Sequence, residues 1–204
     1  KIGFAEHGNS EIVGRAADLS PSGGRVMVDS NQSWTLEQAI ASLRQIEGYD
    51  PYFAEESLRA DAPKSEWEAL AKQTPIPLAG GENIYGIDEF LAMTDVGMKV
   101  LQPDVAKWGG VSGALDLAKS VPDGTMIWPH FMGTAIGQMA SLSISAALGD
   151  ASYCEVDVNE NVLRTDLCGD VIAIKEGRVA LPQDPGLIVP PLPESLTQFA
   201  DKGV

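Results

Sequence analysis

Residues 26–31 read VMVDSN, a short apolar run that ends beside an aspartate. Five more runs of this kind follow: PYFAEES (51–57), IPLAGGEN (76–83), MKVLQPD (98–104), TMIWPHF (125–131) and SYCEVD (152–157). Their charged or titratable positions are spaced by 26, 27, 22, 26 and 25 residues and are Asp29, Glu55, Glu82, Asp104, His130 and Glu155. A helix-like stretch follows each of the first five runs, so the chain reads as a series of β/α units. Because every strand of a (β/α) barrel presents its C-terminal end at the same face, the spacing predicts that these six side chains converge on one mouth.

Five carboxylates that converge on one mouth need their mutual repulsion to be compensated. Converging carboxylates repel one another unless a cation, a proton or a base lies between them, so the pattern predicts metal-dependent acid–base chemistry. Asp29, Glu55 and Glu82 lie at consecutive strand ends and form a set of hard oxygen ligands, which Mg²⁺ prefers. Zinc would more often recruit His or Cys. The alternative is that these acids cap the helices that follow them, as single acidic residues at strand–helix junctions often do.

The segments between and after the runs complete the expected fold. Helices are expected at residues 10–18, 35–47, 63–72, 87–94, 109–121 and 134–148. Thr35 is placed as an N-cap, residues 172–182 are expected to form a hairpin that turns at Glu176–Gly177, and residues 194–200 another helix. KIGF (1–4) is expected to be the end of a strand. Because a closed eight-stranded barrel usually needs about 250 residues, we expect the chain to be the C-terminal part of a longer protein, unless a preceding segment is removed.

Composition limits the classes of partner. The chain has 204 residues, of which 44% are hydrophobic and 21% charged, as in ordinary globular proteins. The net charge of −15 argues against binding to nucleic acid or to anionic membrane surfaces, and no apolar run is long enough to span a membrane. Two cysteines, Cys154 and Cys168, show neither a metal-binding spacing nor a disulfide framework, which suits the cytoplasm.

The motifs VMVDSNQSW, YFAEES, LAGGEN, LQPDVAKWGGVSG and WPHF resemble the enolase superfamily. Within it they are most similar to the mandelate racemase-like group, in order, spacing and local context, from Lys1 to about Leu181. The resemblance implies a TIM-type (β/α)7β barrel, an α/β fold, with the start of the barrel and an N-terminal capping domain outside this chain. It implies barrel units over residues 1–160 and a hairpin and tail over 161–204 that pack toward the capping region. Ser57 departs from the family, which commonly has proline after the double glutamate.

The resemblance also implies how the site works. Asp29, Glu55 and Glu82 would hold Mg²⁺, which stabilises the enediolate formed when a proton α to a carboxylate is removed. Asp104 and His130 resemble the group's His–Asp dyad, in which a carboxylate fixes the imidazole tautomer and raises its basicity. Muconate lactonising-like enzymes carry a catalytic lysine at the position of Asp104. In the alternative reading His130 is an ordinary core or surface histidine.

Two further residues take roles from the resemblance. Lys1 matches the second lysine of the group's Lys-x-Lys motif, opposite the histidine, although at the start of the chain we expect it to be the least well placed of the catalytic set. Glu155 matches the last-strand acid, which in protonated form binds a substrate carboxylate oxygen. Otherwise Lys1 is a solvated terminal residue and Glu155 a cap or ion-pair partner. Four residues are assigned to substrate binding or to support of the ligands: Asn31, Asn83, Glu56 and Lys107.

The predicted function is Mg²⁺-dependent dehydration of an acid sugar, a small-molecule carboxylate. A racemase or epimerase, or a cycloisomerase acting on a sugar lactone, is the alternative within the family. A truncated, non-catalytic barrel that binds a metal or serves in assembly is the alternative from another class. Open sheet edges invite pairing with another chain, so we also expect a homo-oligomer.

Overall fold

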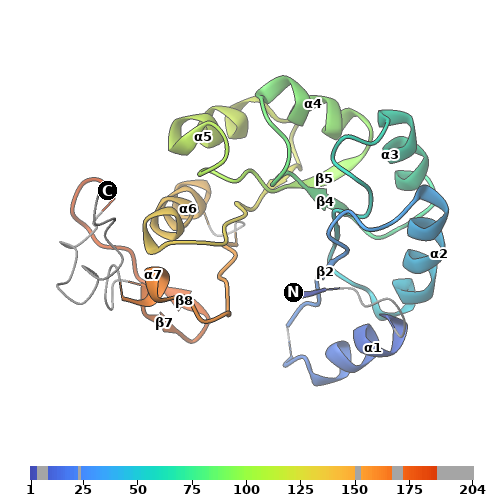
Figure 1. The fold of residues 1–204 in the computed structure, drawn as a ribbon, viewed down its shortest axis with the longest axis horizontal. Helices are drawn as coiled ribbons and strands as arrows, with labels where there is room; N and C mark the ends of the chain where they lie inside the picture. The colour runs from blue at the N-terminus through green and yellow to red at the C-terminus, as the bar shows by residue number, and fades with distance from the viewer. Residues whose placement is uncertain (4–8, 23, 150–152, 167–171, 188–204) are drawn as a thin grey trace, which may run out of the picture.

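The computed structural model describes residues 1–3, 9–22, 24–149, 153–166 and 172–187 (Figure 1). Helices form an outer arc from α1 to α6 around an inner layer of strands, which is the arrangement expected of β/α units. In this view the arc is open between α1 and α7. Strands β7 and β8 form the hairpin that the turn signal at Glu176–Gly177 predicts, and this hairpin lies beside α7.

Six parallel strands make up the inner layer, and each pairs with the next in sequence. They are β1 (Ile2–Gly3), β2 (Val28–Asp29), β3 (Ala54–Glu55), β4 (Leu78–Gly80), β5 (Met98–Leu101) and β6 (Met126–Ile127). The helices that follow these strands are α1 (Asn9–Leu19), α2 (Leu36–Ile46), α3 (Lys64–Ala71), α4 (Ile87–Asp95), α5 (Gly110–Ser120) and α6 (Ala135–Leu148). The shorter elements are η1 (Glu47–Tyr49), α7 (Val162–Thr165), β7 (Ile174–Lys175) and β8 (Arg178–Val179). The predicted series of β/α units is therefore confirmed.

Strand register sets the level of the charged residues. Asp29 on β2 is the register partner of Glu55 on β3. Beyond the end of the β5–β6 ladder, Asp104 and His130 form one further parallel bridge. Parallel neighbours in register bring equivalent positions side by side, so these residues lie at one end of the sheet.

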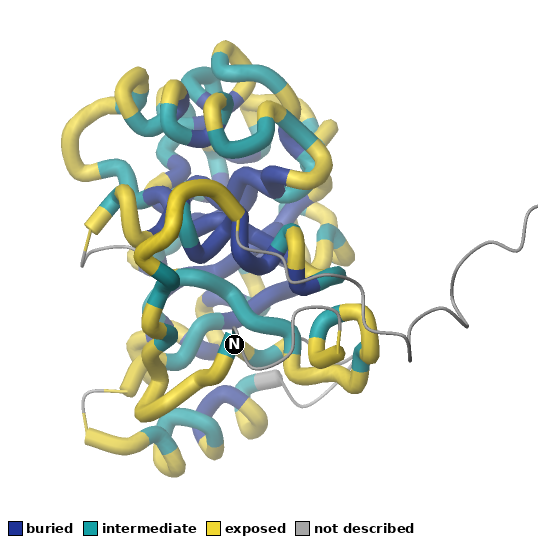
Figure 2. Tube along the Cα trace, turned by 90° about the vertical axis from the view of Figure 1, so that its left-hand side faces the viewer, coloured by how far each residue is buried: buried dark blue, intermediate teal, exposed yellow. Residues whose placement is uncertain are grey.

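The main core lies between the strands and the helical arc. On α2 the apolar residues Ala39, Leu43 and Ile46 follow a helical spacing and are all fully buried. They join Phe90 of α4 and Leu101 of β5 in one cluster. Figure 2 shows the buried part of the trace running through the centre of the molecule, with exposed residues outside. Each fully buried side chain of this size contributes roughly 1.5–3 kcal/mol, so this packing fixes the strand ends.

The start of α2 follows the sequence signal closely. The Thr35 hydroxyl accepts a hydrogen bond from the backbone N–H of Gln38 at 3.3 Å, and the Gln38 side chain accepts one from the Thr35 N–H at 2.9 Å. This reciprocal capping box satisfies two N–H groups that have no partner within the helix. The predicted N-cap at Thr35 is confirmed.

One predicted strand is wrong. SYCEVD was expected to be a strand, but the part of it that the structure describes, residues 153–157, has no strand assignment. The physical reason lies in its carbonyl groups: those of Tyr153 and Glu155 accept hydrogen bonds from side chains of α6. The helix predicted at 194–200 lies outside the described residues. Of the helices in the described ranges, none combines the length and apolar character needed to cross a membrane.

Gly81 allows the end of β4 to lie close to β5, and we predict that it is intolerant of substitution. Its φ is +148°, and a Cβ at this position would lie 2.6 Å from the backbone nitrogen of Gln102. Gly81→Ala should therefore lower the free energy of unfolding by about 1–3 kcal/mol. The measurement is denaturant unfolding of the full-length protein.

Gly48→Ala is the matched control, because nothing lies within 4 Å of a Cβ built there. It should leave the free energy of unfolding unchanged or slightly higher. Equal losses of stability in the two variants would contradict the packing argument at Gly81.

Candidate active site

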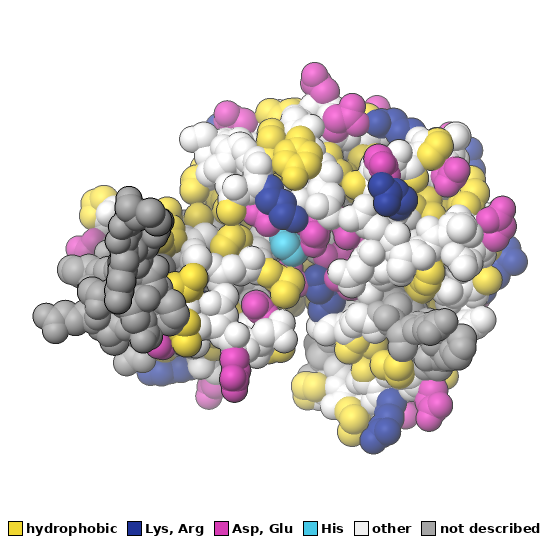
Figure 3. All heavy atoms as spheres, in the orientation of Figure 1, with side chains coloured by type: hydrophobic (Ala, Val, Ile, Leu, Met, Phe, Trp, Pro, Cys, Tyr) yellow, Lys and Arg dark blue, Asp and Glu magenta, His cyan; other side chains and the backbone are white. Residues whose placement is uncertain are grey.

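The charged side chains line a cavity of about 550 Å³ at the C-terminal ends of the strands. Figure 3 shows a histidine side chain in a hollow on this face, with acidic and basic side chains around it. Lys1, Asp29, Glu82, His130 and Glu155 all line the cavity. The predicted convergence is confirmed, and it follows from the shared direction and register of the strands, except at Glu155, whose segment is bonded to α6.

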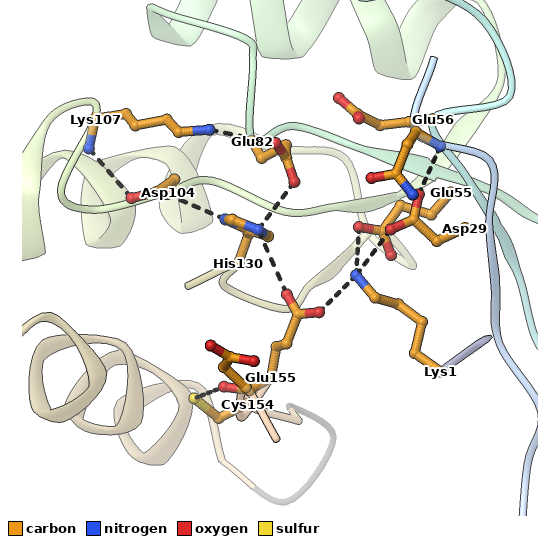
Figure 4. Close-up of polar contacts among 12 residues, drawn as sticks. Lys1, Asp29, Glu55, Glu56, Glu82, Asp104, Lys107, His130, Cys154 and Glu155 are labelled. Atoms are coloured by element: carbon orange, nitrogen blue, oxygen red, sulfur yellow. Dashed lines mark hydrogen bonds and ion pairs between the residues drawn. The ribbon is translucent and has the colours of Figure 1, made fainter. Parts of the chain in front are cut away.

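Lys1 lies at the centre of one group of charges (Figure 4). Its Nζ is 3.3 Å from Asp29 Oδ2, 2.9 Å from Glu55 Oε1 and 2.5 Å from Glu155 Oε1. Burial disfavours the ammonium form, but the charges of Glu55, Glu155 and Asp29 outweigh that cost and raise the pKa of Lys1 above its usual range. Lys1, which was expected to be the least well placed of the catalytic set, has its ammonium group in contact with three carboxylates.

Glu55 is the most deeply buried acid of this group, with 1% of its surface exposed. Burial raises the pKa of Glu55 to about 7, although Lys1 partly offsets the effect. Its second oxygen, Oε2, is buried and has no hydrogen-bond partner among the described residues. A buried carboxylate oxygen without a partner is costly, so this position favours an additional cation.

His130 lies at the centre of the second group. Its Nδ1 is 3.0 Å from Asp104 Oδ2, and its Nε2 is 2.9 Å from Glu82 Oε2 and 3.7 Å from Glu155 Oε2. The predicted hydrogen bond between Asp104 and His130 is present. Both ring nitrogens face carboxylates, which is the environment of a doubly protonated imidazolium.

The pKa values in this group shift together. Burial lowers the pKa of His130, but its hydrogen bonds to Asp104 and Glu82 outweigh burial and raise that pKa to about 10. The hydrogen bond from His130 lowers the pKa of Glu82 to about 2, against an opposing effect of burial. Burial also works against a low pKa for Asp104, yet His130 and the backbone N–H groups of Ala106 and Lys107 bring it below its usual range. His130 thus holds its proton between two ionised acids.

Four further predicted residues take up supporting positions. Asn83 Nδ2 donates to Glu56 Oε1 at 2.8 Å and to Glu82 Oε1 at 3.1 Å, and Lys107 Nζ lies 3.3 Å from the same Glu82 oxygen. Glu56 is buried, which raises its pKa. Asn31 contributes its backbone, since its N–H donates to Asp29 Oδ1 at 2.9 Å. These contacts fix the orientation of the acids that line the cavity.

The three acids suggested as metal ligands fit Mg²⁺ in the type of ligand atom and lie at successive strand ends, but their side chains do not converge on one point. Asp29, Glu55 and Glu82 offer carboxylate oxygens from successive strand ends, and the orphaned Glu55 Oε2 has no other partner among the described residues. The three side chains face different partners: the Lys1 ammonium lies against Asp29 and Glu55, and Glu82 faces His130. Within the described ranges, no group of three His, Cys, Asp or Glu side chains is placed to hold a metal. A metal would therefore have to displace Lys1 and turn Glu82.

A family model described as enolase C-terminal domain-like matches residues 9–194. The chain belongs to this family. The resemblance of its motifs to the enolase superfamily is thereby confirmed.

Three similar proteins each match most of this chain and about half of their own length. D-Galactarolactone cycloisomerase of Agrobacterium fabrum is 27% identical over 98% of this chain and 55% of its own length. Arabinonate dehydratase of Saccharolobus solfataricus is 29% identical over 80% of this chain and 44% of its own length. A solved structure described as mandelate racemase/muconate lactonizing enzyme from Bordetella bronchiseptica RB50 has a TM-score of 0.86 and 38% identity, covering 93% of this chain and 54% of that one. The chain thus spans about half the length of the curated relatives that it matches.

Sequence reasoning missed a layer of residues beneath the charged groups in this enolase C-terminal domain-like chain. Met27, Phe53 and Trp128 line the inner part of the cavity, and Gln102 lies beside them. The nearby Gln102 side chain also acts to lower the pKa of Glu55, against the larger effect of burial. Each of these four residues lies two positions before a charged site residue. Because side chains alternate along a strand, that spacing was a signal for the same interior face.

We predict that His130 remains protonated well above neutral pH in the metal-free protein. Its pKa of about 10 lies above the ordinary value of 6.5. The charged form therefore contributes stability that is fully present below about pH 6.5 and is lost as the pH rises through about 10. NMR titration of the His130 ring in a His7→Gln background, which leaves one histidine, measures the pKa directly.

Asp104→Asn should lower the His130 pKa, because it removes a carboxylate 3.0 Å from Nδ1. Asp116→Asn makes the same change in charge on the exposed face of α5 and should leave the titration unchanged. A midpoint near 6.5 in the parent protein would contradict the proposed charge pairing.

Proposed function

We propose that the site removes a proton α to the carboxylate of a small acid and that its reaction is the dehydration of an acid sugar. The observation that carries the proposal is the placement of two proton-holding groups, Lys1 and His130, on either side of the Glu155 carboxylate. Acid–base chemistry on a bound carbon acid requires such a pair within hydrogen-bond reach of the cavity. The names of the relatives, arabinonate dehydratase and D-galactarolactone cycloisomerase, support a sugar acid or its lactone as the substrate class.

Asp29, Glu55 and Glu82 are the residues that would hold Mg²⁺. When bound there, the ion would supply positive charge that stabilises an enediolate and lowers the pKa of the neighbouring ammonium and imidazolium groups. The surrounding acids favour the protonated form of both groups, because three carboxylates surround Lys1 and two flank His130. A neutral Lys1 Nζ or His130 Nε2 is required for either of them to act as the base.

Each residue then has a defined task in dehydration. Lys1 or His130 takes the proton from the α-carbon, and Glu155 in its protonated form donates a hydrogen bond to a substrate carboxylate oxygen. His130 Nε2 gives a proton to the β-hydroxyl, which leaves as water while the carbon–carbon double bond of an enol forms. Asp104 keeps the imidazole oriented through Nδ1 at 3.0 Å. The enol takes a proton on carbon, loses the proton of its hydroxyl group and becomes a 2-keto acid.

Cycloisomerisation of a sugar lactone is the second candidate. It is favoured by the alignment with D-galactarolactone cycloisomerase, which extends over 98% of this chain. It uses the same proton abstraction, and the leaving group is then the ring carboxylate of the lactone instead of a hydroxyl. The two reactions differ in whether water is released, so the product distinguishes them.

We predict that Mg²⁺ binding depends on Glu55. Isothermal titration calorimetry of the full-length protein with MgCl₂ should show one site, and Glu55→Gln should abolish it, because the variant lacks a buried anionic ligand. Glu68→Gln is the matched control, since Glu68 pairs with Lys72 on the exposed surface of α3. Equal affinity in all three proteins would contradict the assignment of the ligands.

We also predict that turnover depends on His130. The full-length protein should exchange or eliminate the α-proton of an acid sugar in D₂O with Mg²⁺, followed by NMR over a library of acid sugars and lactones. His130→Asn should lower kcat by at least about 100-fold, because it removes a general acid–base group, whereas Glu68→Gln should retain full activity. Mg²⁺ binding without turnover on any library member would favour the non-catalytic alternative.

A further inference from the structure

The segment that carries Glu155 is held by the helix that follows His130. The Gln138 side chain on α6 donates from Nε2 to the Glu155 carbonyl oxygen at 2.8 Å, and the Ser145 hydroxyl donates to the Tyr153 carbonyl at 3.4 Å. Gln138 and Ser145 are seven residues apart on α6, which is two helical turns and therefore one face. The two carbonyls that they hold are two residues apart, as along one edge of an extended chain.

Gln138 is fully buried, and its contacts determine the orientation of its amide. Nε2 faces the Glu155 carbonyl and also lies 3.2 Å from Cys154 Sγ. A carbonyl oxygen can only accept, so the donor end of the amide has to point at it. Gln138 Oε1 is buried without a hydrogen-bond partner among the described residues. That orphan oxygen carries a desolvation cost that an apolar residue of similar size would avoid.

The hydrogen bond from Gln138 links the two halves of the site. α6 begins at Ala135, shortly after His130, so the position of the helix is tied to the strand end that delivers the imidazole. The far end of the link is the Glu155 backbone, whose side chain places Oε1 2.5 Å from Lys1 Nζ and Oε2 3.7 Å from His130 Nε2. Residues 153–157 belong to no strand, so a sheet does not hold this segment in place. A shift of the Glu155 backbone by an ångström would remove one of these contacts.

We propose that Gln138 is a positioning residue that acts through Glu155, setting the distance of its carboxylate from Lys1 and His130. This inference rests on the proposed function for its kinetic consequences. It does not require a contact between Gln138 and the substrate or the metal ligands. Its effect should therefore appear in kcat, with KM and Mg²⁺ affinity unchanged.

A double-mutant cycle in the full-length protein tests the proposal. Gln138→Met keeps the volume and removes the donor, and it should lower kcat about tenfold, the effect expected when a buried carbonyl loses its hydrogen bond. Glu155→Gln lowers kcat by removing the carboxyl itself. If Gln138 acts through Glu155, the double variant should be no slower than Glu155→Gln alone. Independent, multiplicative losses would overturn the proposal.

Two more variants separate positioning from general stability. Ser143→Ala is the control on the same helix, because its hydroxyl bonds the α6 carbonyl of Met139, and it should leave kcat within about twofold. Gln138→Glu should recover activity relative to the parent protein as the pH falls, because only the protonated carboxyl can donate to the Glu155 carbonyl. A flat ratio of the two activities across pH would count against the proposal.

Amide hydrogen exchange of residues 153–157 gives a readout that is independent of turnover. Gln138→Met should exchange faster than Ser143→Ala in this segment, with no difference in the capped α2 helix. If the parent protein acts on no acid sugar or lactone, the proposed function is contradicted. Hydrogen exchange still tests whether Gln138 holds the Glu155 segment. Equal exchange in the two variants would overturn the role of Gln138.

Discussion

The balance of charge at the C-terminal ends of the strands is the constraint on which the rest of the site depends. Sheet register and strand direction bring Asp29, Glu55, Glu82 and Asp104 to one end of the barrel, and the segment bonded to α6 adds Glu155. These acids belong to a chain whose formal net charge is already −15, so their mutual repulsion needs local compensation. Lys1 among three carboxylates, His130 between two and Lys107 beside Glu82 supply it. The raised pKa values of Lys1 and His130 and the low pKa of Glu82 are consequences of this one arrangement.

The same compensation disfavours the neutral forms of Lys1 and His130, which a base requires. An ammonium and an imidazolium that neutralise carboxylates have no free lone pair with which to take a proton from carbon. A divalent cation that took over the carboxylates would remove this restraint, since each acid that it bound would no longer stabilise the proton on Lys1 or His130. Binding of the cation and release of protons are therefore linked. Because of this linkage, the acids that keep Lys1 and His130 protonated would, once they bound a cation, allow either group to lose its proton and act as a base.

Much of the fold was predictable from the sequence because it rests on local signals. The spacing of the apolar runs gave the strands, and the Thr35 and Gln38 pair gave the start of α2. The spacing of Asp104 and His130 gave their hydrogen bond, because one β/α unit separates neighbouring strands. Residues 153–157 were mistaken for a strand because an apolar run does not reveal what its carbonyls will bond, and here α6 provides donors. No sequence pattern marks Gln138 as a positioning residue, because the role of a buried glutamine in an apolar helix depends on the group to which it donates a hydrogen bond.

The local geometry divides the acids into two kinds. Asp29 Oδ1 accepts the N–H of Asn31, and Asp104 Oδ1 accepts the N–H of Ala106, so each aspartate is fixed by the backbone two residues on. Such short-range turns depend only on the chain around the aspartate. Glu82 and Glu155 reach further and find their partners across the cavity, at His130 and Lys1. The two aspartates are therefore held by the backbone next to them, whereas these two glutamates take their partners from other segments of the chain.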